Sequence, residues 1–134
     1  MLSTDKALEL AVATLDNGGT TFHLTERYHP SDGFAVAKYR ELGQFVELKA
    51  FDEMTLLEYV KRNADTFKAD PSTFLGTWYN KEAYTNDAGV FFDVGVYLDT
   101  VMVTFDEQTA LQQCEALEEA SYFDFATMED VMVA

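Results

Sequence analysis

The run from Val90 to Phe105 constrains the fold of this chain more than any other segment. Most of its residues are β-branched or aromatic, and such side chains suit a pleated, partly buried strand. Turn-forming residues, Asn86-Asp87-Ala88-Gly89, come directly before it. Its end, Thr104-Phe105-Asp106-Glu107, has the pattern of a helix capping box. The run therefore predicts sheet followed by helix, either as one strand bent at Gly95 or as two successive strands.

A first helix is predicted over residues 4–16. Apolar side chains recur there at helical spacing, at Leu8, Val12 and Leu15. The Asn-Gly-Gly sequence that follows tolerates the left-handed conformation that ends many helices. An alternating pattern over residues 10–15 leaves a short strand as the alternative.

Two more helices begin at capping-box patterns. Thr55-Leu56-Leu57-Glu58 predicts a helix that extends to about residue 67. The helix after Val90–Phe105 is predicted to extend to about Glu119, with Ala110, Cys114 and Leu117 facing inward. Strands are predicted by period-2 alternation and β-propensity in the remaining apolar segments: 20–26, 34–39, 44–50, 74–79, 121–125 and 131–133.

These elements predict an α+β fold for residues 1–134 as a single domain. We expect one mixed, mostly antiparallel sheet with two or three helices packed on one face. The strands over 20–26, 34–39 and 44–50 are close enough in sequence to form a meander. Trp78, Phe92 and Leu111 are predicted to share one core between the sheet and the C-terminal helix.

The charge of the chain is high and unevenly distributed. It has 24 acidic and 9 basic side chains, for a net charge of −15, yet 48% of its residues are hydrophobic, so we expect it to fold. Residues 1–81 hold 12 acids and all 9 bases, whereas residues 82–134 hold 12 acids and no base. The N-terminal part is therefore nearly charge-balanced and the C-terminal part strongly acidic.

This distribution excludes two kinds of partner and favours a third. Nucleic acids and anionic membranes attract clustered Lys and Arg side chains, and the sequence offers no such cluster. A basic protein surface is the partner that an acidic region would attract.

The N-terminus lacks a secretory pattern, no apolar run is long enough to span a bilayer, and Cys114 is the single cysteine. Together these features predict a cytoplasmic protein.

Four short segments form a recognisable pattern: Gly33-Phe34-Ala35-Val36, Phe74-Leu75-Gly76-Thr77-Trp78, Val90-Phe91-Phe92-Asp93-Val94 and Tyr122-Phe123-Asp124-Phe125. In this pattern the chain resembles small proteins of phages and actinobacterial mobile elements, which have a Gly-Thr-Trp strand, a second strand with a central Asp, a helix, and a closing aromatic-Asp strand. The chain departs from the pattern in its long 80–89 loop and its Phe-rich strand. The resemblance implies a genomic neighbourhood and carries no particular activity.

Few residues suggest catalysis or metal binding. His23 and His29 are the only histidines, and Cys114 lies on the predicted inward face of its helix, so neither type offers a nucleophile with a base or a set of metal ligands. Asp93, Asp99 and Asp124 interrupt apolar strands, where Asp is disfavoured. They would form a shared carboxylate or divalent-cation site if they came together, and outward-facing solvated residues if they did not. We therefore expect no enzyme, no cofactor and no metal.

The acidic C-terminal region carries the favoured functional hypothesis. Acidic residues three or four apart on a helix stand about 5–6 Å from one another, which resembles a row of phosphates. The chain would then be an acidic binding protein, such as a nucleic-acid mimic that occupies the basic groove of a host nuclease or another DNA- or RNA-binding protein. The alternatives are an interaction module or homodimer without catalytic activity, and acidity that serves only solubility or salt tolerance. The predicted contact residues are Asp106, Glu107, Glu115, Glu118, Glu119, Glu129 and Asp130.

Overall fold

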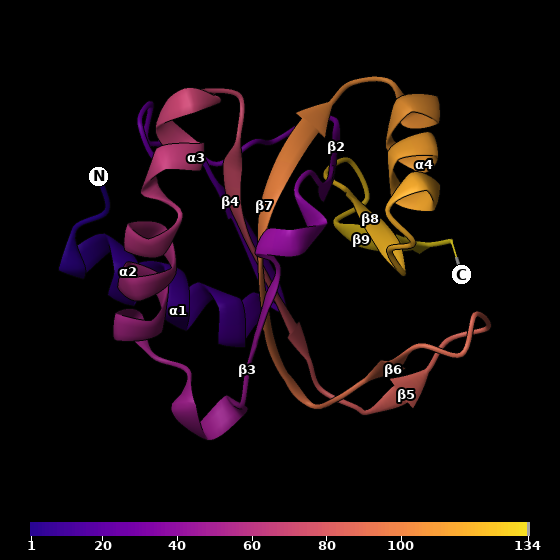
Figure 1. Cartoon of the computed structure of the whole chain (residues 1–134), viewed down its shortest axis with the longest axis horizontal. Helices are drawn as coiled ribbons and strands as arrows, with labels where there is room; N and C mark the ends of the chain where they lie inside the picture. Colours follow the sequence, from indigo (N-terminus) through magenta and orange to yellow (C-terminus); the bar gives the residue numbers. More distant parts are fainter. Residues whose placement is uncertain (134) are drawn as a thin grey trace.

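A computed structural model describes residues 1–133 and confirms an α+β fold around one main antiparallel sheet (Figure 1). The order of strands across the sheet is β1-β4-β7-β2-β8-β9, and β3 pairs with the same edge of β7 as β2. The strands are β1 (Gly19–Phe22), β2 (Phe34–Ala37), β3 (Gln44–Val46), β4 (Phe74–Asn80), β7 (Gly95–Thr104), β8 (Ser121–Asp124) and β9 (Glu129–Met132), with β5 (Tyr84–Thr85) and β6 (Phe91–Phe92) forming a separate two-stranded arm. The helices are α1 (Thr4–Asn17), α2 (Glu53–Arg62), α3 (Ala64–Ala69) and α4 (Glu107–Ala116), with 3₁₀ turns η1 (Arg40–Leu42) and η2 (Leu48–Ala50).

The β-prone run forms two strands, and the longer of them is the centre of the sheet. β7 pairs with β4 along one edge and with β2 and β3 along the other. Because side chains alternate between the two faces of a strand, Val96 and Leu98 face α1 and α2, whereas Tyr97 and Asp99 face the opposite side. Met102, on the same face as Val96, packs against the α4 cluster. The other face of the sheet is therefore not covered by these helices.

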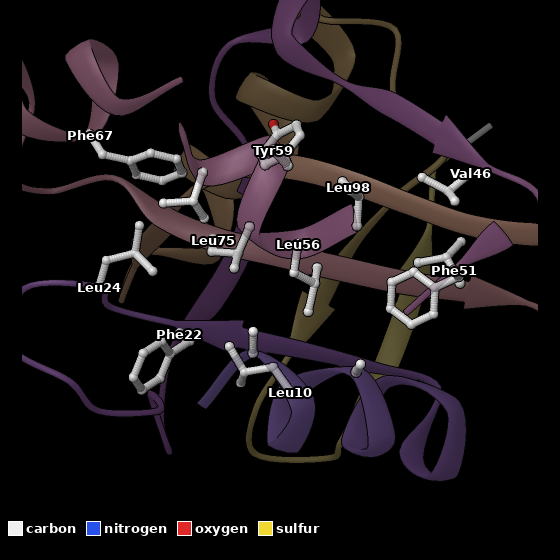
Figure 2. Packing of buried hydrophobic residues seen from close by; sticks show 14 residues of the cluster. Leu10, Phe22, Leu24, Val46, Phe51, Leu56, Tyr59, Phe67, Leu75 and Leu98 are labelled. Atoms are coloured by element: carbon white, nitrogen blue, oxygen red, sulfur yellow. The ribbon is translucent and has the colours of Figure 1, made fainter. Parts of the chain in front are cut away.

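The larger core lies between the sheet and the helices α1, α2 and α3 (Figure 2). Leu10 of α1, Leu56 of α2 and Leu75 of β4 are fully buried there. A smaller cluster holds α4 on the sheet through Val36, Ala110, Cys114 and Tyr122. Burying side chains of this size stabilises the fold by about 1.5–3 kcal/mol for each large apolar residue.

The first helix forms as predicted, but its more apolar stripe faces outward. Thr14 donates to the Leu10 carbonyl and contacts the Thr77 hydroxyl at 2.6 Å, which draws the small residues Ala7 and Ala11 against β4 and α2. Leu8 and Val12 are consequently each 50% exposed. Gly18, at φ 89°, ends the helix in the left-handed conformation.

Two predicted features of the strands and cores are wrong. β1, β2 and β3 form no meander, because each pairs with β4 or β7 from later in the chain. Trp78, Phe92 and Leu111 share no core either: Leu111 packs in the α4 cluster, whereas Trp78 and Phe92 are half-buried and pack together in an aromatic cluster. Alternation along β4 gives the reason, since Leu75 and Thr77 take the face toward the helices and leave Trp78 on the other.

Candidate binding groove

A groove of about 770 Å³ lies over the face of the sheet opposite the α1–α3 core. Its floor is formed by β4, β7 and β2, one wall by β8, β9 and the segment before β8, and the other by aromatic residues at the base of the β5–β6 arm. It also extends to the end of α1 and to β1. Figure 1 shows this arm and the β8–β9 hairpin projecting from the same side of the sheet. No Lys or Arg is among the residues of the described chain that line it.

The aromatic wall is built from β4, β6 and β7. Trp78 and Tyr97 are paired in the register of β4 with β7, and their rings lie 5.2 Å apart at an interplanar angle of 32°. Phe92 approaches both rings at 5.9 Å, and Tyr84 stacks on Phe92 at 5.2 Å. Asn80 holds the arm in place by donating to the Asp93 carbonyl at 2.9 Å. Trp78 and Tyr97 therefore form a supported surface that remains partly exposed to the groove.

Asp99 lies on the floor, in the middle of β7. Gly76 is its cross-strand partner on β4, and a side chain at Gly43 on the other edge would come within 2.9 Å of the Asp99 Oδ1 atom. The Asp99 side chain is half-buried, and no residue of the described chain donates a hydrogen bond to its carboxyl or forms an ion pair with it. Burial, and secondarily the charge of Glu119, raise the pKa of Asp99 to about 7. Asp99 is thus an unpartnered, half-buried carboxyl whose surroundings favour its neutral form.

Glu119 enters the groove because α4 ends three residues before the predicted end of the helix. The Glu119 amide donates to the Cys114 carbonyl at 2.9 Å and the Glu118 amide to the Glu115 carbonyl at 3.1 Å, the two bonds of a Schellman motif. Glu118 takes the left-handed position of this motif, at φ 55°. The chain reverses there and directs Glu119 into the groove, where burial raises its pKa and the nearby Arg40 partly offsets that effect.

Asp130 completes the acidic lining from the other wall. It lies on β9 opposite Phe123 of β8, and both residues line the groove. The Asp130 side chain is exposed, and protein atoms near its carboxyl raise its pKa. Burial and then the charge of Asp130 raise the pKa of Tyr84, so the β5–β6 arm and the β8–β9 hairpin are electrostatic neighbours across the groove.

The predicted contact residues are consequently divided between two faces. Asp130 and Glu119 line the groove, whereas Glu115 and Glu118 are exposed beyond it, and Glu118 pairs with Arg40 at 3.2 Å. The predicted row of Glu115, Glu118 and Glu119 along one helix is wrong, because the helix ends at Ala116. Glu129 is exposed on β9, next to Asp130.

The remaining two predicted contacts serve the structure of α4. Asp106 is the N-cap and accepts a hydrogen bond from the Gln108 amide at 3.2 Å. Glu107 accepts one from the Tyr122 hydroxyl at 2.9 Å. The helix therefore begins at Glu107, and its cap is Asp106 where the sequence pattern predicts Thr104.

The hypothesis of a shared cation site at Asp93, Asp99 and Asp124 is wrong. The Asp93 carboxylate accepts a hydrogen bond from the Val94 amide in the turn before β7, and that of Asp124 accepts one from the Ala126 amide after β8. Within residues 1–133, no three His, Cys, Asp or Glu side chains come close enough together to hold a metal ion. Cys114 is buried in the α4 cluster, and burial raises the pKa of its thiol to about 11.

Sequence reasoning missed the groove as a site. The sequence suggests Asp99 as a candidate metal ligand and predicts Trp78 as a core residue. The sequence does hold one signal for the groove. Trp78 is two residues from Gly76 on one strand, and Tyr97 is two residues from Asp99 on another, and residues two apart share a face of a strand. The sequence does not show that β4 and β7 are neighbours in the sheet, because the β5–β6 arm lies between them in the chain.

None of the helices in residues 1–133 is both long and apolar enough to cross a membrane. In comparisons with protein-family models, with curated proteins and with solved structures, none matches this chain.

Proposed function

We propose that this chain is a non-catalytic binding protein whose acidic C-terminal region engages a basic surface of a partner protein. One observation carries the proposal. Of the 12 acidic side chains in residues 82–134, Glu118 is the one that forms an ion pair within the described residues, and that pair is exposed. The other acidic side chains of this region are left without an internal cation, which favours a cationic partner.

The groove supports this proposal by its shape and composition. It combines carboxylates with aromatic rings, the side chains that receive Lys and Arg at protein interfaces. A basic surface that covers it would also approach Glu129 on β9. The resemblance to mobile-element proteins favours the nucleic-acid-binding surface of a host protein as the partner, in which case the chain is a decoy for DNA or RNA.

Capture of partners from a lysate of the native host tests the proposal. We expect a set of basic proteins to be captured at about 50 mM salt and released at about 200 mM, because screening weakens contacts between exposed charges. A variant with Glu115→Gln, Glu129→Gln and Asp130→Asn should lose this capture by about tenfold or more, equivalent to about 1.4 kcal/mol. Addition of duplex DNA should release the partners if the chain is a nucleic-acid decoy.

A matched control removes the same charge from the nearly balanced part of the chain. Asp5→Asn, Glu9→Gln and Asp16→Asn change exposed residues of α1 and should leave capture unchanged. Equal loss from both triple variants would indicate net charge alone, and capture that is insensitive to salt and to both variants would contradict the proposal.

A homodimer is the second candidate, and the exposed apolar stripe of α1 favours it. Leu8, Val12 and Leu15 are 50%, 50% and 37% exposed and follow the i, i+4, i+7 spacing of a helix-packing surface. Two copies related by a two-fold axis would bury this stripe against itself. Sedimentation of a dimer that dissociates in a Val12→Lys variant would support this candidate, and a monomer at all concentrations would exclude it.

A further inference from the structure

We propose that the groove is a binding site for one organic cation, an alkylammonium or guanidinium group. The Asp99 carboxylate would bind this cation beside the ring faces of Trp78 and Tyr97. This inference rests on the proposed function, because the natural source of such a group would be a Lys or Arg side chain of the basic partner. A free polyamine would present the same chemistry, and the experiment below distinguishes the two sources.

The Asp99 carboxyl on the floor of the groove has no partner among the described residues. A buried carboxylate without a hydrogen bond or a counter-charge is unfavourable. The half-buried Asp99 carboxylate has neither within the described residues, and the Val101 side chain occupies the space above Gly76, the cross-strand partner of Asp99. The charge that acts on the Asp99 carboxyl is that of Glu119, which has the same sign. A cation in the groove would therefore be stabilised by both residues.

The aromatic wall favours an organic cation over an inorganic one. A cation within about 6 Å of a ring face is attracted by the quadrupole of the ring, and Trp provides the strongest such interaction. Trp78 and Tyr97 are neighbours of Asp99 on the floor, through Gly76–Asp99 and Trp78–Tyr97 pairing. An alkyl chain that leads to the charge would contact Phe92 and Phe123 along the groove. A metal ion would gain nothing from these surfaces, and within residues 1–133 no three His, Cys, Asp or Glu side chains come close enough together to hold one.

The groove also disfavours anionic ligands. Asp130 lies at its wall, and the groove-lining part of the described chain contains neither Lys nor Arg. Anionic ligands would therefore be repelled, and a neutral apolar ligand would leave Asp99 unpaired. Charge and shape together point to a cationic side chain that enters with its alkyl stem along the aromatic wall.

The test uses Trp78 as the reporter, because it is the single tryptophan of the chain. The probes are N-acetyl-lysine methylamide, N-acetyl-arginine methylamide and spermidine, with N-acetyl-norleucine methylamide as the uncharged match. We expect saturable changes in Trp78 fluorescence, and in the NMR signal of its indole N–H, with the cationic probes. Norleucine should produce less than a tenth of the affinity.

Two variants and one control connect the signal to the carboxyl groups. Asp99→Asn should weaken binding of the cationic probes by tenfold or more, and Glu119→Gln by a smaller factor. Asp87→Asn removes the same charge from the exposed turn of the β5–β6 arm and should bind as the wild type does. Circular dichroism verifies that each variant is folded.

The outcomes separate this inference from the proposed function. Tighter binding of the lysine or arginine probe than of spermidine identifies a partner side chain as the source, and the reverse order identifies a free polyamine. Equal affinity for the norleucine and lysine probes would contradict a cation-binding site in the groove. An unchanged affinity for the cationic probes in both Asp99→Asn and Glu119→Gln would contradict it as well. If salt-sensitive capture of basic proteins persisted in that case, the proposed function would stand and the acidic exterior would carry it.

Discussion

At the residue scale, the position of Asp99 in the fold lowers the stability of the protein once its carboxyl is ionised. Its carboxyl is desolvated by β4, β7 and the turn at Gly43, and its pKa of about 7 means that folding favours its protonated form. Glu119 and Asp130 line the same groove with pKa values raised in the same direction. A group whose pKa is raised on folding binds more protons in the native state, so its ionisation lowers the free energy of unfolding as pH rises. Ionisation of these residues therefore costs stability, as is common at functional sites.

The expected consequence is a stability that falls between about pH 4 and pH 8. Each pKa unit corresponds to about 1.36 kcal/mol, so Asp99 contributes a decline on the order of 2–4 kcal/mol across this window. Asp99→Asn should raise the free energy of unfolding at pH 8 by about 2 kcal/mol and make the decline shallower. Glu119, whose pKa is raised as well, contributes in the same direction. Urea denaturation at pH 5 and pH 8 measures both effects, with Asp87→Asn as the control. Parallel profiles for Asp99→Asn and the wild type, or a wild type that gains stability toward pH 8, would contradict this assignment.

At the element scale, the helix predicted from Thr55 to about residue 67 forms with another cap and in two parts, since α2 ends at Arg62 and α3 begins at Ala64. The Asp52 side chain accepts hydrogen bonds from the Met54 and Thr55 amides, and the Thr55 hydroxyl accepts one from the Asp52 amide. Thr55 is therefore the third helical residue, where the sequence pattern predicts it as the cap. Asp52→Ala should lower the free energy of unfolding by about 1 kcal/mol, whereas Glu58→Ala, at an exposed helical position, should change it by less than about 0.5 kcal/mol. Thermal denaturation of the two variants distinguishes these caps, and a larger loss from Glu58→Ala would indicate the predicted one.

The same scale shows what sequence predicts here and what it does not. Local signals predicted the fold class, helix α1, the strand-forming run and the buried position of Cys114, because propensity, capping and periodicity act over a few residues. They did not predict that β4 and β7 pair across the β5–β6 arm, because strand pairing depends on contacts far apart in sequence. The sequence does not predict the end of α4, because Glu118 occupies the left-handed position after the helix, where glycine is the usual residue. The candidate groove depends on both missed features.

At the scale of the whole molecule, the charge of the chain is polarised in space as well as in sequence. The larger core and its helices are built from the nearly charge-balanced part of the chain, with β7 as the main acidic-region contribution. The acidic part supplies α4, β8 and β9, which form the far end of the sheet and one wall of the groove (Figure 1). Such an arrangement presents one acidic side to an approaching basic surface and would orient it before contact.

The central claim is that this groove is the surface that receives a basic partner. Titration of the ¹⁵N-labelled protein with a lysine-rich peptide, followed by NMR, tests it most directly at the level of single residues. We predict that the largest shifts fall on the groove, at the Trp78 indole and at the amides of Asp99, Glu119 and Asp130, and that they diminish at high salt. Shifts confined to the exposed face of α4 around Glu115, or spread evenly over the acidic residues, would contradict the claim.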